Sequence, residues 1–223
     1  MLRLAAPGML TAVVLRFLYC PWYYPSGDDA AYSAIARSWS SPRAPYERYF
    51  VDRPPGMLVI ARLFAPPSHP RVGFAVLNVV CLVVVAISAV GIARTLGVSS
   101  RACAMLSLLI VLTMGHPGLV GPYVSNESVE IAPAMLSVLL VLRGRAKPRS
   151  WLVLAGMSAG VAFSVKQSGV DVVGATGLLV AWEARRNVAI GAKRLAGFVA
   201  GFRSCCGSPS AVRRPESLSV ARV

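Results

Sequence analysis

Long apolar stretches alternate with short polar segments along most of this chain. A helix that crosses a lipid bilayer needs about 20 apolar residues, or fewer where neighbouring protein shelters its ends. A last apolar stretch begins near Leu195 and ends at Arg203. The pattern predicts an all-α fold, a polytopic bundle of transmembrane helices with about six spans and an incomplete seventh. The six predicted spans are Leu4 to Tyr19, Val72 to Ile92, Ala102 to Val120, Ser128 to Leu142, Trp151 to Val165 and Val170 to Trp182.

The segment between the first two predicted spans, residues 20–71, contains two shorter helical patterns. Asp28 to Trp39 carries apolar residues on one helix face and begins with an aspartate suited to an N-cap. Met57 to Phe64 is amphipathic, too short to span, and follows two prolines, the second suited to a helix start. We expect this second helix to lie along a membrane surface. The sequence therefore predicts an external loop that contains short surface helices.

The apolar pattern ends abruptly after residue 202. Residues 203–223 contain Ser, Arg and Pro without apolar periodicity, which predicts a disordered tail after a transmembrane module of residues 1–202. Two Gly-x-x-x-Gly patterns, at Gly156 and Gly160 and at Gly197 and Gly201, lie inside apolar segments. Glycines at this spacing let two helix backbones approach closely, so they predict helix packing.

Composition supports a membrane protein rather than a soluble domain. Hydrophobic residues make up 56% of the chain and charged residues 14%, with a net charge of +14. The basic residues stand in short clusters between apolar runs, as residues that flank membrane spans do. No basic patch interleaved with aromatic residues is present, so we predict contact with membrane lipid and no nucleic-acid binding. The predicted location is the cell membrane, with several passes.

The distribution of Lys and Arg predicts which loops share a side. The loops near residues 94–101, 143–149 and 185–194 are rich in Lys and Arg, which places them in the cytoplasm. The loop 121–127 has neither residue, and the turn near Lys166 has one, so both are predicted to be external. The loop 20–71 is then external too, and its arginines indicate contacts with an anionic ligand.

Asp28 and Asp29 form an acidic pair just after the first predicted span. A carboxylate that is partly desolvated binds a proton more readily and can serve as a general base. Capping of the following helix explains one aspartate and leaves the second without a role. Neighbouring aromatic residues that would exclude water are Trp22, Tyr23 and Tyr24.

Two further motifs with acidic residues are candidates for binding. Asp52 and Arg53 precede two prolines that fix the backbone, which favours a site over a surface ion pair in a rigid turn. Glu127 and Glu130 stand one turn apart at the start of a predicted span, where they either cap the helix or contact a metal or an acceptor.

Lys166 lies between two short apolar runs, with Asp171 five residues further on. A charge at such a depth is costly unless it is paired or reaches the interface, so it indicates a functional group. A lipid phosphate is a natural partner for it. The alternative interpretation is an ordinary interfacial lysine that marks a loop.

Together these motifs resemble the polyprenyl-phosphate-dependent GT-C glycosyltransferases, especially the protein O-mannosyltransferase and aminoarabinose transferase group. The resemblance rests on an acidic pair after a first span, an Asp-Arg-Pro-Pro stretch where that group has Asp-Lys-Pro-Pro, and a Gly-rich helix that ends in a lysine. It extends to a second acidic element, and it covers residues 1 to about 200. The residues that carry it are Asp28, Asp29, Tyr32, Ala36, Asp52 to Pro55, Arg71, Asn126, Glu127 and Gly156 to Gln167.

The resemblance implies transfer of a sugar from a polyprenyl-phosphate donor to an extracytoplasmic hydroxyl. It implies that Asp28 or Asp29 acts as the base, while a divalent metal is left open as a cofactor. Family members typically have more spans and often a soluble C-terminal domain, so the change after Phe202 is interpreted as a truncated or frame-shifted copy, and catalytic competence is left open. The substrate and phosphate ligands implied are Asp52, Arg53, Arg71, Glu127 and Lys166.

Two other classes of function compete with this one. A transporter subunit would use Lys166 and Asp171 as charges on a substrate path, and it predicts inverted repeats that the sequence does not show. A non-catalytic membrane fragment would only pack against partner membrane proteins.

Overall fold

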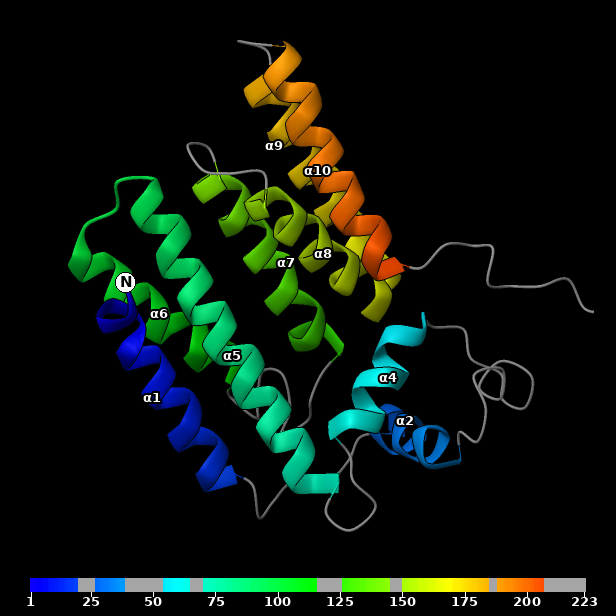
Figure 1. Ribbon diagram of the computed structural model, residues 1–223. Coiled ribbons are helices and arrows are strands. Elements are labelled where there is room, and N and C mark those ends of the chain that lie inside the picture. The colour runs from blue at the N-terminus through cyan, green and yellow to red at the C-terminus, as the bar shows by residue number, and fades with distance from the viewer. Residues whose placement is uncertain are drawn as a thin grey trace, which may run out of the picture.

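The computed structural model describes residues 1–19, 27–38, 54–64, 70–115, 126–144, 150–184 and 188–206. Within these ranges every regular element is a helix, so the predicted all-α class is confirmed (Figure 1). The elements are α1 (Leu2–Tyr19), α2 (Gly27–Ser38), α4 (Pro55–Phe64), α5 (Pro70–Thr95), α6 (Ser100–Gly115), α7 (Asn126–Arg143), α8 (Ser150–Val165), the 3-10 helix η3 (Gln167–Gly169), α9 (Val170–Ala184) and α10 (Val188–Cys206).

Most predicted helices begin and end within a few residues of the observed ones. Proline stands at the first position of α4 and of α5, where its missing N–H costs no helical hydrogen bond. The last helix differs from the prediction, since α10 begins at Val188 and continues through Arg203 to Cys206. A basic residue in the last turn complements the helix dipole, so Arg203 does not end the helix. The proposed division of the chain at residue 202 stays a prediction.

One of the described helices, over Val72–Thr95, is long and apolar enough to cross a membrane. Pro55–Phe64, Ser100–Gly115 and Ser150–Val165 are apolar but shorter. Short helices can still lie within a bilayer where protein covers their ends. The multi-pass arrangement is therefore a prediction that these lengths permit.

Neighbouring helices pack side by side, α1 on α5 and α6, α5 on α7, α7 on α8, and α8 on α10. The ends of α5, α7 and α9 lie toward the top of Figure 1, and the end of α8 lies lower, on the side of α4. The Arg143 guanidinium, at the end of α7, lies 2.7 Å from the Met1 sulfur, so the start of α1 meets the end of α7. The helix ends that flank the predicted basic loops thus share one side of the bundle.

A central cluster of buried residues joins α2, α4, α5, α7 and α8. Tyr32 and Ala36 of α2 are buried there, which confirms the apolar face predicted for that helix. The apolar face of α4 packs here as well, although the sequence predicts that it rests on a membrane surface. The central cluster consists of Tyr32, Ala36, Met57, Leu58, Ala61, Phe74, Leu77, Cys81, Val85, Val129, Ala132 and Val165.

The contact between α8 and α10 depends on the absence of side chains. A Cβ added at Gly156 would overlap the Phe198 carbonyl oxygen, and one added at Gly201 would overlap the Val153 carbonyl oxygen. Gly160 likewise faces Cys205 and Phe202. The close packing predicted from the Gly-x-x-x-Gly patterns is confirmed for these glycines.

Polar side chains add hydrogen bonds between helices. Ser158 of α8 donates to the Pro133 carbonyl of α7 at 2.8 Å, and Ser137 of α7 donates to the Ala155 carbonyl of α8 at 2.8 Å. In α1, the buried Arg16 donates through Nε to Asn78 Oδ1 of α5 at 2.7 Å. These contacts fix the register of α8 on α7 and of α1 on α5.

Candidate functional site

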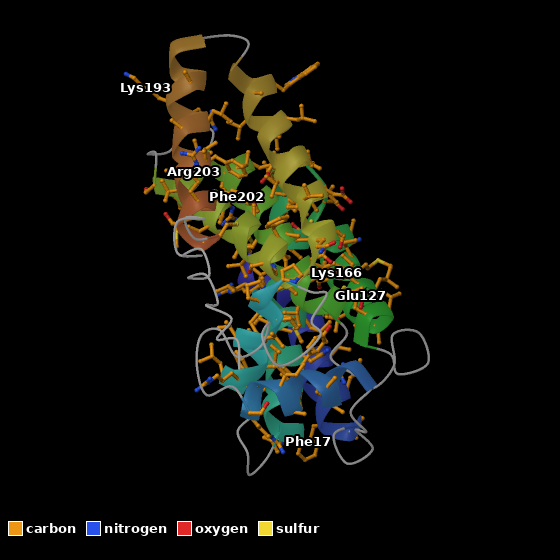
Figure 2. The ribbon with its side chains drawn as sticks, turned by 90° about the vertical axis from the view of Figure 1, so that its right-hand side faces the viewer. Phe17, Glu127, Lys166, Lys193, Phe202 and Arg203 are labelled. Carbon is orange, nitrogen blue, oxygen red and sulfur yellow. The ribbon has the colours of Figure 1, made fainter. Side chains whose placement is uncertain are left out.

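Lys166 lies where α8 ends and the chain turns toward α9. Its backbone is extended, with φ −148° and ψ 142°, so the helical path breaks at this residue. We call residues 166–169 the α8–α9 turn. The break directs the side chain toward the first turn of α7, and Lys166 Nζ donates to Glu127 Oε1 at 2.7 Å (Figure 2). Two residues expected to bind a substrate phosphate therefore meet.

A second contact joins α7 to the same turn. Ser168 Oγ lies 2.8 Å from Glu130 Oε1 and 3.0 Å from Glu130 Oε2, so its hydroxyl donates to this carboxylate. Glu127 and Glu130 are one helical turn apart and face the same neighbour. Both acids therefore contact the α8–α9 turn.

The start of α4 also reaches this region. Gly56 lies so close to Ser164 that a Cβ added at residue 56 would overlap the Ser164 carbonyl and hydroxyl oxygens. Ser164 stands two residues before Lys166. The proline stretch that follows Asp52 and Arg53 therefore leads into α4 beside the α8–α9 turn.

The helix that carries the acidic pair joins the same region through its apolar face. Asp28 and Asp29 lie in the first turn of α2, which begins at Gly27, so the helix starts earlier than the predicted N-cap. Tyr32, one turn further on, is buried in the central cluster with Met57, Val129 and Val165. Val129 stands between Glu127 and Glu130, and Val165 directly precedes Lys166.

The structure gives fewer contacts for the remaining predicted site residues. Arg71 is the second residue of α5, which approaches α4 and α7. Asp52 and Arg53 lie outside the described residues. Asp171 is exposed in the first turn of α9, and among the described carboxylates it is Glu127 that pairs with Lys166. The structure therefore brings Glu127 and Lys166 together and leaves Asp52, Arg53 and the aspartate side chains as predictions.

The exposure of the Lys166–Glu127 pair shows what it can do. The side chains are 26% and 56% exposed, respectively, so solvent and solutes reach both charges. An ion pair of this kind is weak because water competes for each partner. An anionic group that brings several acceptor oxygens, such as a phosphate, can therefore compete with Glu127 for the ammonium.

Metal binding finds no support among the described side chains, which contain no group of three or more His, Cys, Asp and Glu residues suited to hold an ion. The acidic candidates that the structure does describe are engaged by Lys166 and Ser168. The question of a divalent metal therefore turns on the acidic pair and on Asp52.

A comparison with protein-family models decides the family. The model for dolichyl-phosphate-mannose-protein mannosyltransferases matches residues 47–198, more than half of the chain. The chain belongs to this family. Members of the mannosyltransferase family are membrane proteins and use a dolichyl-phosphate sugar donor. No curated protein and no solved structure matches the chain significantly.

The matched range of the mannosyltransferase family contains the α8–α9 turn, α7 and α4. The resemblance to this group noted from the sequence is thereby confirmed at the level of the family. Sequence reasoning singled out Glu127 and Lys166 but missed Ser168 and Gly169. Serine and glycine are too common to stand out in a sequence. The available signal was the pair of acids one turn apart at the start of α7, which indicated that some polar group faces them.

Proposed function

We propose that this chain is a multi-pass membrane glycosyltransferase that transfers a sugar from a polyprenyl-phosphate donor to an extracytoplasmic hydroxyl. The observation that carries the proposal is the Lys166–Glu127 pair, a cation held at an exposed position where α4, α7 and the α8–α9 turn converge. The family membership supports the donor class, since members use a dolichyl-phosphate sugar.

In the proposed reaction the acceptor oxygen attacks the anomeric carbon while the bond from that carbon to the phosphate oxygen breaks. The bonding electrons leave with the phosphate, and the hydroxyl proton passes to a carboxylate. The transition state resembles an oxocarbenium ion, so the departing phosphate needs a cation and the hydroxyl needs a base. Polyprenyl phosphate and the glycosylated acceptor are the products.

Lys166 takes the role of the cation, and Glu127 holds it in place until the donor phosphate replaces that carboxylate. Arg53 and Arg71 add positive charge toward the phosphate, and Asp52 is a further substrate ligand. Asp28 or Asp29 accepts the proton, because α2 packs in the central cluster beside the α8–α9 turn. The roles of Asp28, Asp29, Asp52, Arg53 and Arg71 come from the resemblance to the GT-C glycosyltransferases, and that of Lys166 is supported by its exposed pair with Glu127.

The test is a transfer assay on membranes that contain the chain, with radiolabelled dolichyl-phosphate-mannose as donor. Membranes without the chain give the background. We expect Lys166→Ala to lower the rate about 10- to 100-fold, because a hydrogen bond to a charged group contributes about 1.5–3 kcal/mol. Substitution of the base by Asn, either Asp28→Asn or Asp29→Asn, lowers it by about 10²- to 10⁴-fold.

A matched control is Lys193→Ala, since Lys193 is exposed and lies near the top of the molecule, well away from Lys166 at mid-height (Figure 2). Its substitution leaves the rate unchanged. Wild-type rates in all three site variants would overturn the assignment of the residues. Background rates for the wild-type chain would instead favour the non-catalytic alternative, in which the helices only pack against other membrane proteins.

A further inference from the structure

The two contacts between α7 and the α8–α9 turn differ in their exposure to solvent. The outer contact, Lys166 with Glu127, has a carboxylate that is 56% exposed. The inner contact joins the exposed Ser168 hydroxyl to Glu130, which is 8% exposed. A buried carboxylate is less open to competition from dissolved ions than an exposed one. Of the two carboxylates, Glu130 is therefore the harder one to separate from its partner.

The turn itself is fixed from the other side by Gly169. A Cβ added there would overlap backbone atoms of Ala162 and Phe163, so the turn folds directly onto the last turn of α8. The Gly169 N–H donates to the Lys166 carbonyl at 2.9 Å, and the Lys166 N–H donates to the Ala162 carbonyl at 3.2 Å. The backbone of Lys166 is thus tied to α8, while Ser168 ties the turn to α7.

We propose that Glu130 and Ser168 are positioning residues, which hold the α8–α9 turn in place while Lys166 exchanges Glu127 for the donor phosphate. The part that concerns phosphate rests on the proposed function. The part that concerns the position of Lys166 rests on the contacts alone.

In this proposal the two carboxylates on one face of α7, Glu127 and Glu130, have different roles. Glu127 gives up its cation to the donor phosphate, because its ion pair is open to solvent and therefore weak. Glu130 keeps its hydroxyl donor, because a phosphate has no access to a group that is 8% exposed. Lys166 then moves between two partners without movement of the backbone that carries it.

The first experiment measures the position of Lys166 without catalysis. The full chain in lipid nanodiscs is acetylated with a water-soluble active ester, and mass spectrometry gives the rate at Lys166 relative to the exposed Lys193. We expect Ser168→Ala to raise this ratio about threefold or more, because the ammonium leaves Glu127 more often once the turn is released. Ser168→Thr retains a hydroxyl and keeps the wild-type ratio. An unchanged ratio in Ser168→Ala would overturn the positioning role.

The second experiment is the transfer assay with radiolabelled dolichyl-phosphate-mannose. We expect Ser168→Ala to raise KM about three- to tenfold with a smaller change in kcat, and Ser168→Thr to restore KM. A general loss of folded protein would instead lower kcat at constant KM, and this result would count against positioning.

The two experiments separate the two proposals. A raised acetylation ratio in Ser168→Ala, in a chain that transfers no sugar, supports the positioning contact and contradicts the proposed function. Normal transfer by the wild-type chain, with an unchanged acetylation ratio and KM in Ser168→Ala, supports the function and contradicts the positioning contact.

Discussion

The helix α8 contacts its neighbours in two opposite ways. Along its length it packs against α10 through glycines, with backbone carbonyls filling the space where side chains would stand. At its end it passes into a turn whose polar side chains meet two carboxylates of α7. The first contact tolerates no added atom, whereas the outer part of the second is open to exchange. The fold therefore depends on the glycine contact with α10, and under the proposed function the donor phosphate binds at the polar contact with α7.

The largest effect on stability is expected from a single methyl group added at the glycine contact between α8 and α10. We expect Gly156→Ala to destabilise the chain by about 1–3 kcal/mol, because a Cβ there overlaps the Phe198 carbonyl and forces α10 outward. Thermal unfolding in detergent, followed by circular dichroism, measures the change. The matched control is Gly174→Ala in α9, where nothing lies within 4 Å of an added Cβ. This control is neutral or slightly stabilising, since Ala favours helix. Equal losses at both positions would contradict the role given to the glycines.

The face of α8 toward α7 combines helix packing with serine hydrogen bonds. We expect a smaller loss of stability from a substitution on this face. Ser158→Ala removes the 2.8 Å hydrogen bond to the Pro133 carbonyl and costs about 0.6–1.7 kcal/mol. The same unfolding measurement applies. Ser204→Ala is the control, because its hydroxyl donates within its own helix to the Ala200 carbonyl. If the two serine variants unfolded alike, the contact between α7 and α8 would owe little to Ser158.

The smallest effect on stability is expected at the exposed ion pair. Glu127→Gln changes the free energy of unfolding by less than about 1 kcal/mol, because a solvent-exposed pair contributes little. Under the proposed function it also strengthens binding of dolichyl phosphate severalfold at low salt, since the competing carboxylate is gone. Raising the ionic strength removes this gain.

Titration with dolichyl phosphate in nanodiscs measures this effect, with Asp171→Asn as a control for the loss of one negative charge on an exposed site. Weaker binding by Glu127→Gln at every salt concentration would show that Glu127 assists the ligand and does not compete with it.

The lengths of the apolar stretches, together with the positions of prolines and glycines, predict much of the fold. Proline at the start of α4 and α5 acts through the local backbone, so its consequence can be read in sequence. Glycines at a spacing of four in α8 and α10 form a recognisable pattern for close packing between helices, although the sequence does not say which helix is the partner. The end of α10 could not be predicted so well. Whether a helix continues past Arg203 depends on its packing against α8, which is a tertiary effect.

The candidate site was predictable only in part, for a similar reason. The lysine and the two glutamates are conspicuous in apolar surroundings, because a charge there needs a partner. Their pairing joins residues 39 positions apart, and the Ser168 contact joins residues 38 positions apart. Such distant contacts are set by how α7 and α8 cross. The apolar face of α4 illustrates the same limit, since its pattern cannot distinguish lipid from a protein core.

The buried Arg16 has a consequence for biosynthesis. Asn78, which accepts its Nε–H, follows 62 residues later in the chain. If α1 enters the bilayer as it emerges from the ribosome, its guanidinium arrives before the amide that will accept this hydrogen bond. The hydrogen bond between the two helices can therefore form only after α5 has been made.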